Sequence, residues 1–387
     1  MSFIGQNTLR TKQLNRTLVF QTLLRLEAPT RQEIAAFTKL TPATITNIVN
    51  ELMEYGYVVE LGNGVSELKR AGRKTVVLGL NEEKKRVAGV HIRSDRVELG
   101  IVTLRGKVLK STSFDLPASI GQDEFLELLT RELESFLQKN KALPVSCIGV
   151  GSVGLVDYES GRILEAEHLG WENVAIEAVL SRSFNLPVYV DHHVRAMTLA
   201  EKMFGACKNQ SDFLCVYIGQ GIGSGLFLRD QLYRSETTGA GEFGHMTYQP
   251  GGTACWCGNN GCLERYASEE AVLHELNMDS ITSVLEACRN GDADAVQALR
   301  SAGGKIAVVL SSFINMFHVQ KIVIGGDMAR EDGPLLLEIR EKANADSFLA
   351  RKRMVEITTT ALGDQQGIIG AASIALLESI FTVSINK

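Results

Sequence analysis

The sequence predicts an α/β protein in which two lobes surround a cleft and a winged helix-turn-helix domain precedes them. Near the N-terminus, short helical segments joined by a tight turn are followed by two strand-like segments. Beyond them, a group of adjacent strands followed by alternating helices and strands occurs twice. With 387 residues, the chain is too long for one compact core. We therefore expect the winged domain at 1–80, a first lobe at 81–190 and 365–387, and a second lobe at 191–364.

The first two helices are predicted from apolar spacing and capping residues. One apolar stripe of the first helix contains Leu14, Leu18, Val19 and Leu23. Thr30 is a natural N-cap for the second helix, and Glu33, three residues later, completes a capping box. Lys39 lies in the turn that follows, where a glycine is usual, so we expect backbone strain at this position.

The third helix has two faces of different chemistry. Thr41 and Pro42 mark its start, because threonine is a favoured N-cap and proline a favoured first residue, and Gly56 ends it. The apolar face contains Ile45, Ile48, Val49, Leu52 and Met53. The other face has small, uncharged groups suited to base edges, which favours DNA binding over a purely structural three-helix module. The residues expected to contact DNA are Thr41, Ala43, Thr44, Thr46, Asn47 and Asn50.

Residues 58–81 are predicted to form two strands that flank a basic loop. The cations of this loop suit contacts with phosphates or the minor groove; they are Lys69, Arg70, Arg73 and Lys74. The charge distribution points the same way, because residues 1–80 carry a net charge of +4 and the remainder carries −9. The N-terminal module is therefore expected to bind operator DNA.

Composition favours a cytoplasmic protein without a membrane partner. The chain is 45% hydrophobic and 22% charged, as in soluble globular proteins, and no segment approaches the apolar length of a membrane span. The N-terminal residues lack the apolar core of a signal peptide. Three of the seven cysteines fall within eight residues, which suggests one metal site and four ordinary thiols in a reducing compartment.

The body of the chain begins at Arg86 with three strands and short turns. The first group of expected elements is strands at 86–92, 96–104 and 107–116, a helix at 123–140, a strand at 145–157, a helix at 173–185 and a strand at 187–190. A second strand–turn–strand group at 212–228 opens the second lobe. The later elements are a helix at 303–317, a strand at 321–326 and a C-terminal helix at 367–381.

The glycine-rich turn at 219–225 does not fit a dinucleotide-binding fingerprint. Ser224 takes the place of the last glycine, and a strand follows where the fingerprint needs a helix. Such turns can cradle a phosphate, but a plain tight hairpin explains the pattern at least as well.

Three cysteines in a glycine-rich loop form the most specific pattern. Cys255, Cys257 and Cys262 follow His245, which precedes the first of them by ten positions. Three thiolates and one imidazole fill a tetrahedral Zn²⁺ shell, and a closed shell leaves no position for substrate, so we expect structural zinc. The alternative is three reduced thiols without a metal. The pattern favours zinc, because this arrangement serves no evident packing purpose.

The segments "GAGEFGH" and "CWCGNNGCLE" resemble the signature of the ROK family, which comprises bacterial sugar-responsive repressors and sugar kinases on the actin-like ATPase (ribonuclease H-like) fold. The resemblance extends over the whole chain, and the N-terminal module resembles the repressor branch. It implies zinc ligation by His245, Cys255, Cys257 and Cys262. It also implies a homo-oligomer, either a dimer or a tetramer.

Three features of the kinase branch are altered. An Asp-x-Gly-Gly-Thr phosphate loop is replaced by "HIRSD", which has no glycine to let the backbone approach a phosphate. An Asn-Asp pair, whose aspartate is the general base, is replaced by His192 and His193. A second loop, Gly-Thr-Gly, becomes Gly219-Gln220-Gly221. Without a nucleotide cradle a histidine base has nothing to activate, so we expect neither ATP binding nor kinase activity.

The sugar contacts of the family are retained or remodelled. Glu242, His245 and Glu264 match them, and an asparagine of the family corresponds to His168. The ligand-binding set implied by the resemblance is His168, His192, His193, Glu242, His245 and Glu264. His91 borders the cleft, where a structural role is favoured. Three roles stay open for the histidines: binding a sugar with altered hydroxyl or acidic groups in a pocket that titrates near neutral pH, forming a second metal site, or contacting only each other.

The predicted function is a repressor of carbohydrate-utilisation genes that binds operator DNA under control of a sugar-derived ligand. Ligand in the cleft would shift the population of lobe arrangements and so the spacing of paired DNA-binding modules. One alternative is a sugar kinase with an appended DNA-binding domain. Another is a ligand-independent DNA-binding protein with a vestigial pocket. Glu242 and Glu264 argue against the latter, because buried carboxylates without partners are costly.

Overall fold

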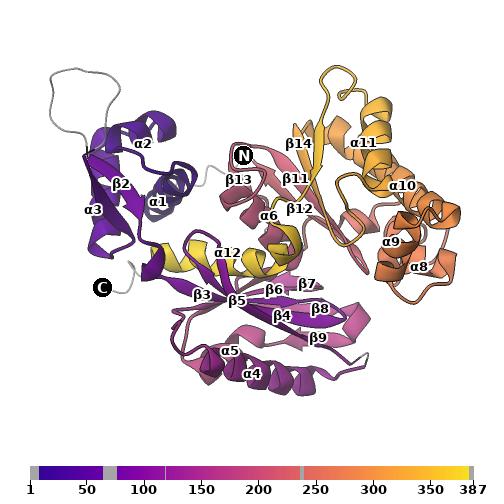
Figure 1. Ribbon diagram of the computed structural model, residues 1–387, viewed down its shortest axis with the longest axis horizontal. Coiled ribbons are helices and arrows are strands. Elements are labelled where there is room, and N and C mark those ends of the chain that lie inside the picture. Colours follow the sequence, from indigo (N-terminus) through magenta and orange to yellow (C-terminus); the bar gives the residue numbers. More distant parts are fainter. Residues whose placement is uncertain (1–7, 64–75, 118, 236–238, 383–387) are drawn as a thin grey trace.

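The computed structural model describes residues 8–63, 76–117, 119–235 and 239–382 (Figure 1). This part of the chain contains a winged N-terminal module and two lobes, each built on a five-stranded sheet. None of its helices combines the length and the hydropathy that a bilayer span requires.

The N-terminal module has the three helices and two strands of a winged helix-turn-helix. They are α1 (Thr8–Arg25), α2 (Arg31–Thr38), α3 (Pro42–Glu54), β1 (Val58–Asn63) and β2 (Val76–Leu80). The predicted capping box is confirmed, because the Thr30 hydroxyl accepts from the Glu33 amide and the Glu33 carboxylate accepts from the Thr30 amide. β1 and β2 pair antiparallel. The predicted wing cations Lys69, Arg70, Arg73 and Lys74 lie outside the described residues.

The buried face of α1 differs from the predicted stripe. Leu14 is 40% exposed, whereas Val19, Phe20 and Leu23 are buried. Arg16, on the side of the helix opposite Leu14, takes the inner position and forms an ion pair with Glu51 of α3. Because a buried ion pair occupies this turn, the apolar side chain of Leu14 is left to solvent, and its assignment to the core was wrong.

Lys39 ends α2 in the left-handed conformation, with φ 57° and ψ 18°. A side chain is strained there and glycine is not, so Lys39→Gly is expected to stabilise the module by about 0.5–1 kcal/mol. Hydrogen exchange of the α2 and α3 amides would measure the change. Lys12→Gly, at an exposed position inside α1, is the control, and it should destabilise the module by about 1 kcal/mol. Faster exchange in Lys39→Gly would refute the expectation.

The first lobe is built on a sheet with strand order β10-β6-β3-β4-β5. β3, β4 and β5 pair antiparallel, and β6 and β10 extend the sheet parallel to β3. Helices α4 and α5 pack on one face, and α12 packs on the other. The elements are β3 (Arg86–Ile92), β4 (Arg96–Thr103), β5 (Val108–Asp115), α4 (Gln122–Lys139), β6 (Ile148–Ser152), β7 (Leu155–Asp157), β8 (Arg162–Ala166), β9 (Trp171–Val174), α5 (Ile176–Phe184), β10 (Val188–His192) and α12 (Gln366–Thr382).

The strand predicted at 145–157 is two strands that belong to different sheets. β6 ends at Ser152, and β7 joins the small antiparallel sheet β7-β8-β9. The chain turns at Gly154, which has φ +86° and lies so close to Glu165 that a Cβ would be 2.3 Å from the carbonyl oxygen. The helix predicted at 173–185 begins only at Ile176, because the preceding residues form β9.

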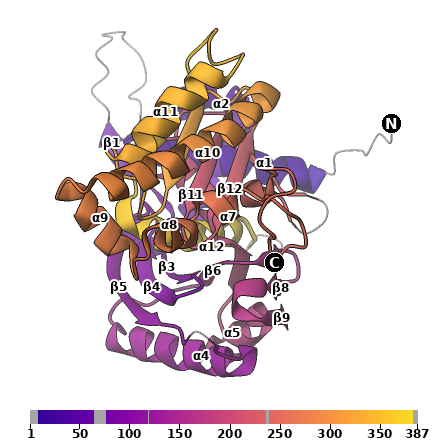
Figure 2. The same cartoon turned by 90° about the vertical axis from the view of Figure 1, so that its right-hand side faces the viewer.

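The second lobe repeats the same topology in the strand order β13-β12-β11-β14-β15. β11, β12 and β13 are antiparallel, and β14 and β15 continue in parallel with β11. Figure 2 shows α10 and α11 on the outer side of this lobe. The elements are α6 (His193–Met203), β11 (Phe213–Ile218), β12 (Ile222–Leu228), β13 (Gln231–Leu232), α7 (Glu264–Ala267), α8 (Glu269–Leu276), α9 (Ile281–Arg289), α10 (Ala293–Phe317), β14 (Lys321–Gly325), α11 (Pro334–Asp346) and β15 (Glu356–Thr359). The helix predicted at 303–317 is the second part of α10.

Helices α6 and α12 pack against each other between the two sheets (Figure 1). Every residue of α6 is buried, as expected for a helix enclosed on all sides. α12 also contacts the winged module: Leu376 and Ile380 share one hydrophobic cluster with Val19 and Phe20 of α1. The module is thus joined to the first lobe through a common apolar core.

Candidate functional site

A pocket of about 280 Å³ lies between the two lobes. The first lobe contributes the carboxyl ends of its parallel strands β3, β6 and β10, a usual place for a ligand site on such a sheet. The second lobe contributes the start of α6, the β11–β12 turn, the short 3-10 turn Phe243–His245 and the start of α7. All six residues of the expected ligand-binding set line the pocket: His168, His192, His193, Glu242, His245 and Glu264.

Glu264 is held at the pocket wall by two hydrogen bonds. Its Oε2 accepts from the Ile222 amide at 2.8 Å, and its Oε1 accepts from the Trp256 indole at 2.9 Å. Burial opposes ionisation, but His168 and these two donors outweigh it and lower the pKa of Glu264. Glu264 is therefore a carboxylate with oriented lone pairs, ready to accept from a ligand hydroxyl.

The glycine turn between β11 and β12 is a tight hairpin packed against Glu264. A Cβ on Gly221 would lie 2.5 Å from the Glu264 carboxylate, and one on Gly219 would lie 2.8 Å from the Tyr217 ring. The Gly219 carbonyl accepts from the Glu269 amide. These glycines are required by close packing, which favours the plain-hairpin interpretation of the sequence over a phosphate cradle.

His168 and Glu242 complete the polar wall. The Glu264 carboxylate, 3.9 Å from His168 Nε2, raises the pKa of His168. Desolvation raises the pKa of Glu242, and His245 offsets part of this effect. The expectation that both glutamates are buried without partners is wrong, because Glu264 has two donors and Glu242 is exposed to the pocket. The cost of unpartnered carboxylates is therefore no argument against a vestigial pocket.

The expected metal ligands come together beside the pocket. His245 Nδ1 lies 3.6 Å from Cys255 Sγ, Cys257 Sγ lies 3.6 Å from Cys262 Sγ, and all four ligand atoms lie within 4.8 Å of one another. Metal bonds of about 2.3 Å to sulfur and about 2.0 Å to nitrogen give tetrahedron edges of roughly 3.5–3.8 Å. The cluster is thus suited to one tetrahedral ion. Burial and the neighbouring sulfurs raise the pKa of Cys262 to about 12, so an ion binding there displaces a proton.

His245 belongs to both the expected metal set and the expected ligand set, and its ring can serve both. Nδ1 faces Cys255, which leaves Nε2 for the pocket that the side chain lines. The Trp256 ring packs edge-on against His245 at 4.5 Å between ring centroids and against His168 at 5.3 Å. A metal in the cluster would therefore fix the orientation of one pocket wall.

The histidines at the strand ends form a packed group. His193 Nδ1 lies 3.2 Å from His91 Nε2, and the His192 and His193 rings meet edge-on at 4.8 Å. Burial lowers the pKa of His192 to about 3, and it lowers that of His193 well below the ordinary histidine value. His91 does not line the pocket. Among the described residues, only the His245 cluster brings three or more metal-ligating groups together, so a second metal site is not supported.

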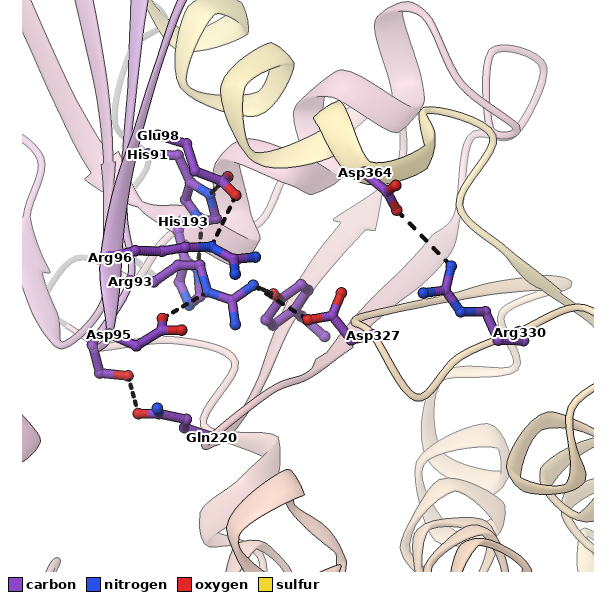
Figure 3. A network of polar contacts seen from close by, with 12 residues as sticks. His91, Arg93, Asp95, Arg96, Glu98, His193, Gln220, Asp327, Arg330 and Asp364 are labelled. Atoms are coloured by element: carbon purple, nitrogen blue, oxygen red, sulfur yellow. Dashed lines mark hydrogen bonds and ion pairs between the residues drawn. The ribbon is translucent and has the colours of Figure 1, made fainter. Parts of the chain in front are cut away.

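Two buried arginine networks went unnoticed in the sequence. Arg93, in the "HIRSD" turn, donates to the Tyr217 hydroxyl at 3.0 Å and lies 3.7 Å from Asp327, so it bridges the two lobes (Figure 3). Ser94 beside it donates to Gln220 across the same cleft. The "HIRSD" turn, which replaces the phosphate loop of the kinases, thus forms side-chain contacts between the two lobes.

The second network surrounds Asp191, which is fully buried at the end of β10. Its carboxylate accepts from Arg195 at 2.7 Å and from both Nε and Nη2 of Arg234, at 3.0 and 2.8 Å. Arg234 also lies 3.9 Å from Glu378 of α12. This network of ion pairs therefore connects the end of β10, beside His192, to α12.

The expected DNA-contacting face of α3 is open to solvent. Thr41, Ala43, Thr46, Asn47 and Asn50 are exposed, and Thr44 is half-buried. The hydroxyls of Thr41 and Thr44 bond to each other at the helix N-cap, and Thr46 donates to the Pro42 carbonyl. Asn47 at the middle of this face has the most freedom to reach a partner.

Comparison with known proteins places this architecture among its relatives. The xylose repressor of Caldicellulosiruptor bescii is 30% identical over 398 residues, which cover 97% of this chain and 98% of that one. A crystal structure of a ROK family transcriptional regulator, described as a homologue of the Escherichia coli MLC protein, is 27% identical. It superposes with a TM-score of 0.81 over 97% of this chain and 99% of its own.

The sugar-kinase branch shares the two-lobed fold. A ROK family glucokinase from Streptomyces griseus, solved with glucose and AMPPNP, is 24% identical with a TM-score of 0.67, over 74% of this chain and 98% of its own. These neighbours and the repeated sheet topology confirm the predicted actin-like fold. The sequence profile of the ROK family matches residues 87–378, so the chain belongs to the ROK family.

Proposed function

We propose that this protein is a transcriptional repressor of carbohydrate-utilisation genes, which binds operator DNA with its winged module and a sugar in the interlobe pocket. One observation carries the proposal: the chain combines an exposed polar face on α3 with a pocket lined by all six expected sugar-site residues. The repressor and regulator names of its relatives support it. In this proposal, residues 1–80 bind DNA. The first sensor lobe consists of 81–190 and 365–387, and the second consists of 191–364.

The route from pocket to DNA runs through the two central helices. His193, the first residue of α6, lines the pocket, α6 packs on α12, and α12 shares an apolar core with α1. A ligand that binds one lobe arrangement more tightly shifts the population toward it. In a homodimer or tetramer, this shift changes the distance between two α3 helices and so the fit to an operator.

A kinase is the weaker candidate. Where the family kinases have a phosphate loop, Arg93 is engaged with Tyr217 and Asp327 across the cleft. The other glycine turn is filled by its packing on Glu264. We therefore propose no ATP binding and no catalysis; hexose-dependent ATP turnover by the purified protein would support the kinase alternative instead.

We propose Zn²⁺ as the ion of the His245 cluster, in a structural role. Three thiols and one imidazole are the donors that zinc prefers, and they fill its four positions without water or substrate. Reduced thiols of this kind persist in the cytoplasm, which we propose as the compartment.

DNA selection with genomic fragments tests the proposed function. The protein should prefer certain fragments over random DNA with an affinity that falls steeply with salt. Thr46→Glu, which puts a charge on the exposed face of α3, should weaken that binding about tenfold or more. Gln138→Glu adds the same charge on exposed α4, far from α3 (Figure 1), and should leave binding unchanged.

Sugar dependence is the second part of the same experiment. D-xylose, D-glucose or N-acetylglucosamine should raise the melting temperature of the protein and change its affinity for the selected fragment. Selective DNA binding without any response to these sugars would support the ligand-independent alternative. A protein that prefers no fragment over random DNA would overturn the proposed function.

A further inference from the structure

Behind His193, a chain of buried hydrogen bonds leads away from the pocket (Figure 3). His91 Nδ1 lies 2.8 Å from Glu98 Oε2, and His91 Nε2 lies 3.2 Å from His193 Nδ1. The residues His91 and His193 are buried, with 2% and 8% of their surface exposed. Arg96 donates to the other Glu98 oxygen, Oε1, at 3.2 Å. The four residues therefore form one line from a charged arginine to the pocket.

The protons along this line are fixed by its carboxylate end. Burial opposes ionisation of Glu98, but the hydrogen bond to His91, the positive charge of a protonated His91 and the charges of Arg96 and Arg93 outweigh it and lower the pKa of Glu98. An ionised carboxylate only accepts, so His91 Nδ1 must donate. At a pH where His91 carries no charge, its Nε2 is then an acceptor, and His193 Nδ1 must donate to it. His193 Nε2 is left without a proton.

This bare nitrogen is the one available to a ligand. Nδ1 of His193 is taken by His91, the Tyr217 ring packs edge-on at 5.4 Å, and the side chain lines the pocket. No hydrogen-bond partner of Nε2 is found in the part of the chain that the structure describes. Burial keeps the pKa of His193 far below its usual value, so the ring offers a lone pair and no charge.

The pocket also contains two carboxylates that accept hydrogen bonds, while the imidazoles of His168 and His245 can donate. Glu242 and Glu264 face the same space. The one arginine of the lining, Arg93, lies 3.0 Å from Asp95 and 3.7 Å from Asp327, so its charge is already balanced. An anionic group placed among His193, Glu242 and Glu264 would meet lone pairs and negative charge, whereas hydroxyl groups would find acceptors there.

We propose that Glu98 and His91 act as positioning residues that hold His193 as an uncharged acceptor, and that the pocket therefore selects an uncharged, hydroxyl-donating sugar over a sugar phosphate or a sugar acid. This rests on the proposed function for the identity of the pocket as a sugar site. Of the two kinds of sugar ligand that the sequence left open, with altered hydroxyl groups or with acidic groups, the proposal favours the first. In this arrangement a ligand hydroxyl donates to His193 Nε2 and others donate to Glu242 and Glu264.

The isosteric substitution Glu98→Gln is expected to exchange the donor and acceptor roles along these hydrogen bonds. In Glu98→Gln, Arg96 can only donate, so it keeps the amide oxygen at the Oε1 position, and the amide NH₂ faces His91. His91 Nδ1 then accepts, its Nε2 donates, and His193 becomes protonated at Nε2. Asp95→Asn is the matched control for the tautomer alone: this carboxylate lies in the same hairpin and contacts no histidine, but its ion pair with Arg93 belongs to the pocket.

Nitrogen-15 NMR of the full-length protein at pH 8 reads the tautomer directly, with the His193 signal assigned by its loss in His193→Gln. We expect an unprotonated Nε2 in wild type and Asp95→Asn, and a protonated Nε2 in Glu98→Gln. The wild-type result does not depend on the folding of Glu98→Gln. A protonated Nε2 in wild type would overturn the proposal.

Ligand binding is measured on the same proteins by calorimetry. In wild type, glucose 6-phosphate, gluconate and xylonate should bind about tenfold or more weaker than glucose or xylose. Among deoxyfluoro derivatives of the sugar that binds, one should be about tenfold weaker than its parent in wild type and close to its parent in Glu98→Gln, because fluorine only accepts. A phosphate or acid that binds more tightly than the free sugar would overturn the proposal. If no sugar binds wild type, the proposed function fails, while the tautomer still decides the role of Glu98.

Discussion

Replacing Cys262 by serine is expected to abolish metal retention and to destabilise the second lobe by at least about 3–5 kcal/mol. Cys262 is fully buried, and its sulfur lies within 4.8 Å of the other three ligand atoms. The loop from Met246 to Leu263 is held by turn hydrogen bonds and isolated bridges rather than by regular strand pairing, so a bound ion would add a strong cross-link to it. The loss should be below the roughly 10–16 kcal/mol of small zinc-finger peptides, because the surrounding lobe stays folded.

Metal content by atomic emission and thermal unfolding would measure this effect. Sugar binding should fall with it, because the proposed ion would fix the orientation of His245, against which Trp256 packs in the pocket wall. Cys288→Ser is the control, since this half-buried thiol in α9 lies outside the cluster. Equal metal content and equal stability in Cys262→Ser and Cys288→Ser would favour the interpretation of the cluster as reduced thiols without metal.

Asp191→Asn is expected to cost about 3–5 kcal/mol of folding free energy. The substitution keeps the size of the side chain but leaves Arg195 and Arg234 without their shared counter-charge, in a site where Asp191 itself has no exposed surface. The penalty comes from uncompensated buried charge rather than from lost packing. Chemical denaturation would measure it. Asp332→Asn at an exposed position should change stability by less than about 0.5 kcal/mol, and a similar value for Asp191→Asn would contradict the expectation.

The same carboxylate predicts the acid response of the protein. Burial opposes ionisation of Asp191, but the two arginines outweigh it and lower its pKa below that of an unfolded chain. A depressed folded-state pKa contributes stability that is fully present above the unfolded value of about 3.9 and is lost as the pH falls through the folded value. The stability difference between wild type and Asp191→Asn should therefore be constant near neutral pH and shrink below about pH 4.

Local patterns were the predictable part of this protein. The capping box at Thr30 and the left-handed Lys39 followed from short-range rules, and both are present. The metal cluster was predictable because its spacing is specific by itself. The pairing of His91 with Glu98 was also accessible in principle. A turn centred on Ser94 and Asp95 places these two residues directly opposite each other in the β3–β4 ladder.

Long-range contacts were not predictable from one sequence. Asp191 meets Arg234 across 43 positions, and no local period links them. The break at Gly154 was missed because "VGSVGLVD" has strand-like composition on both sides of a glycine whose φ of +86° is imposed by close contact with β8. Burial of the pocket glutamates was misjudged for the same reason, since donors such as the Ile222 amide come from a distant turn.

The apolar core shared by α1 and α12 holds the winged module, with the proposed DNA-contacting helix α3, in one orientation relative to the first lobe. The winged module cannot rotate relative to α12 without exposing Val19, Phe20 and their partners to water. A change in the orientation of α3 therefore requires a movement of the first lobe, to which the module is joined. Under the proposed function, a ligand in the pocket would therefore reorient the whole winged module, and in a homo-oligomer it would change the angle between two such modules.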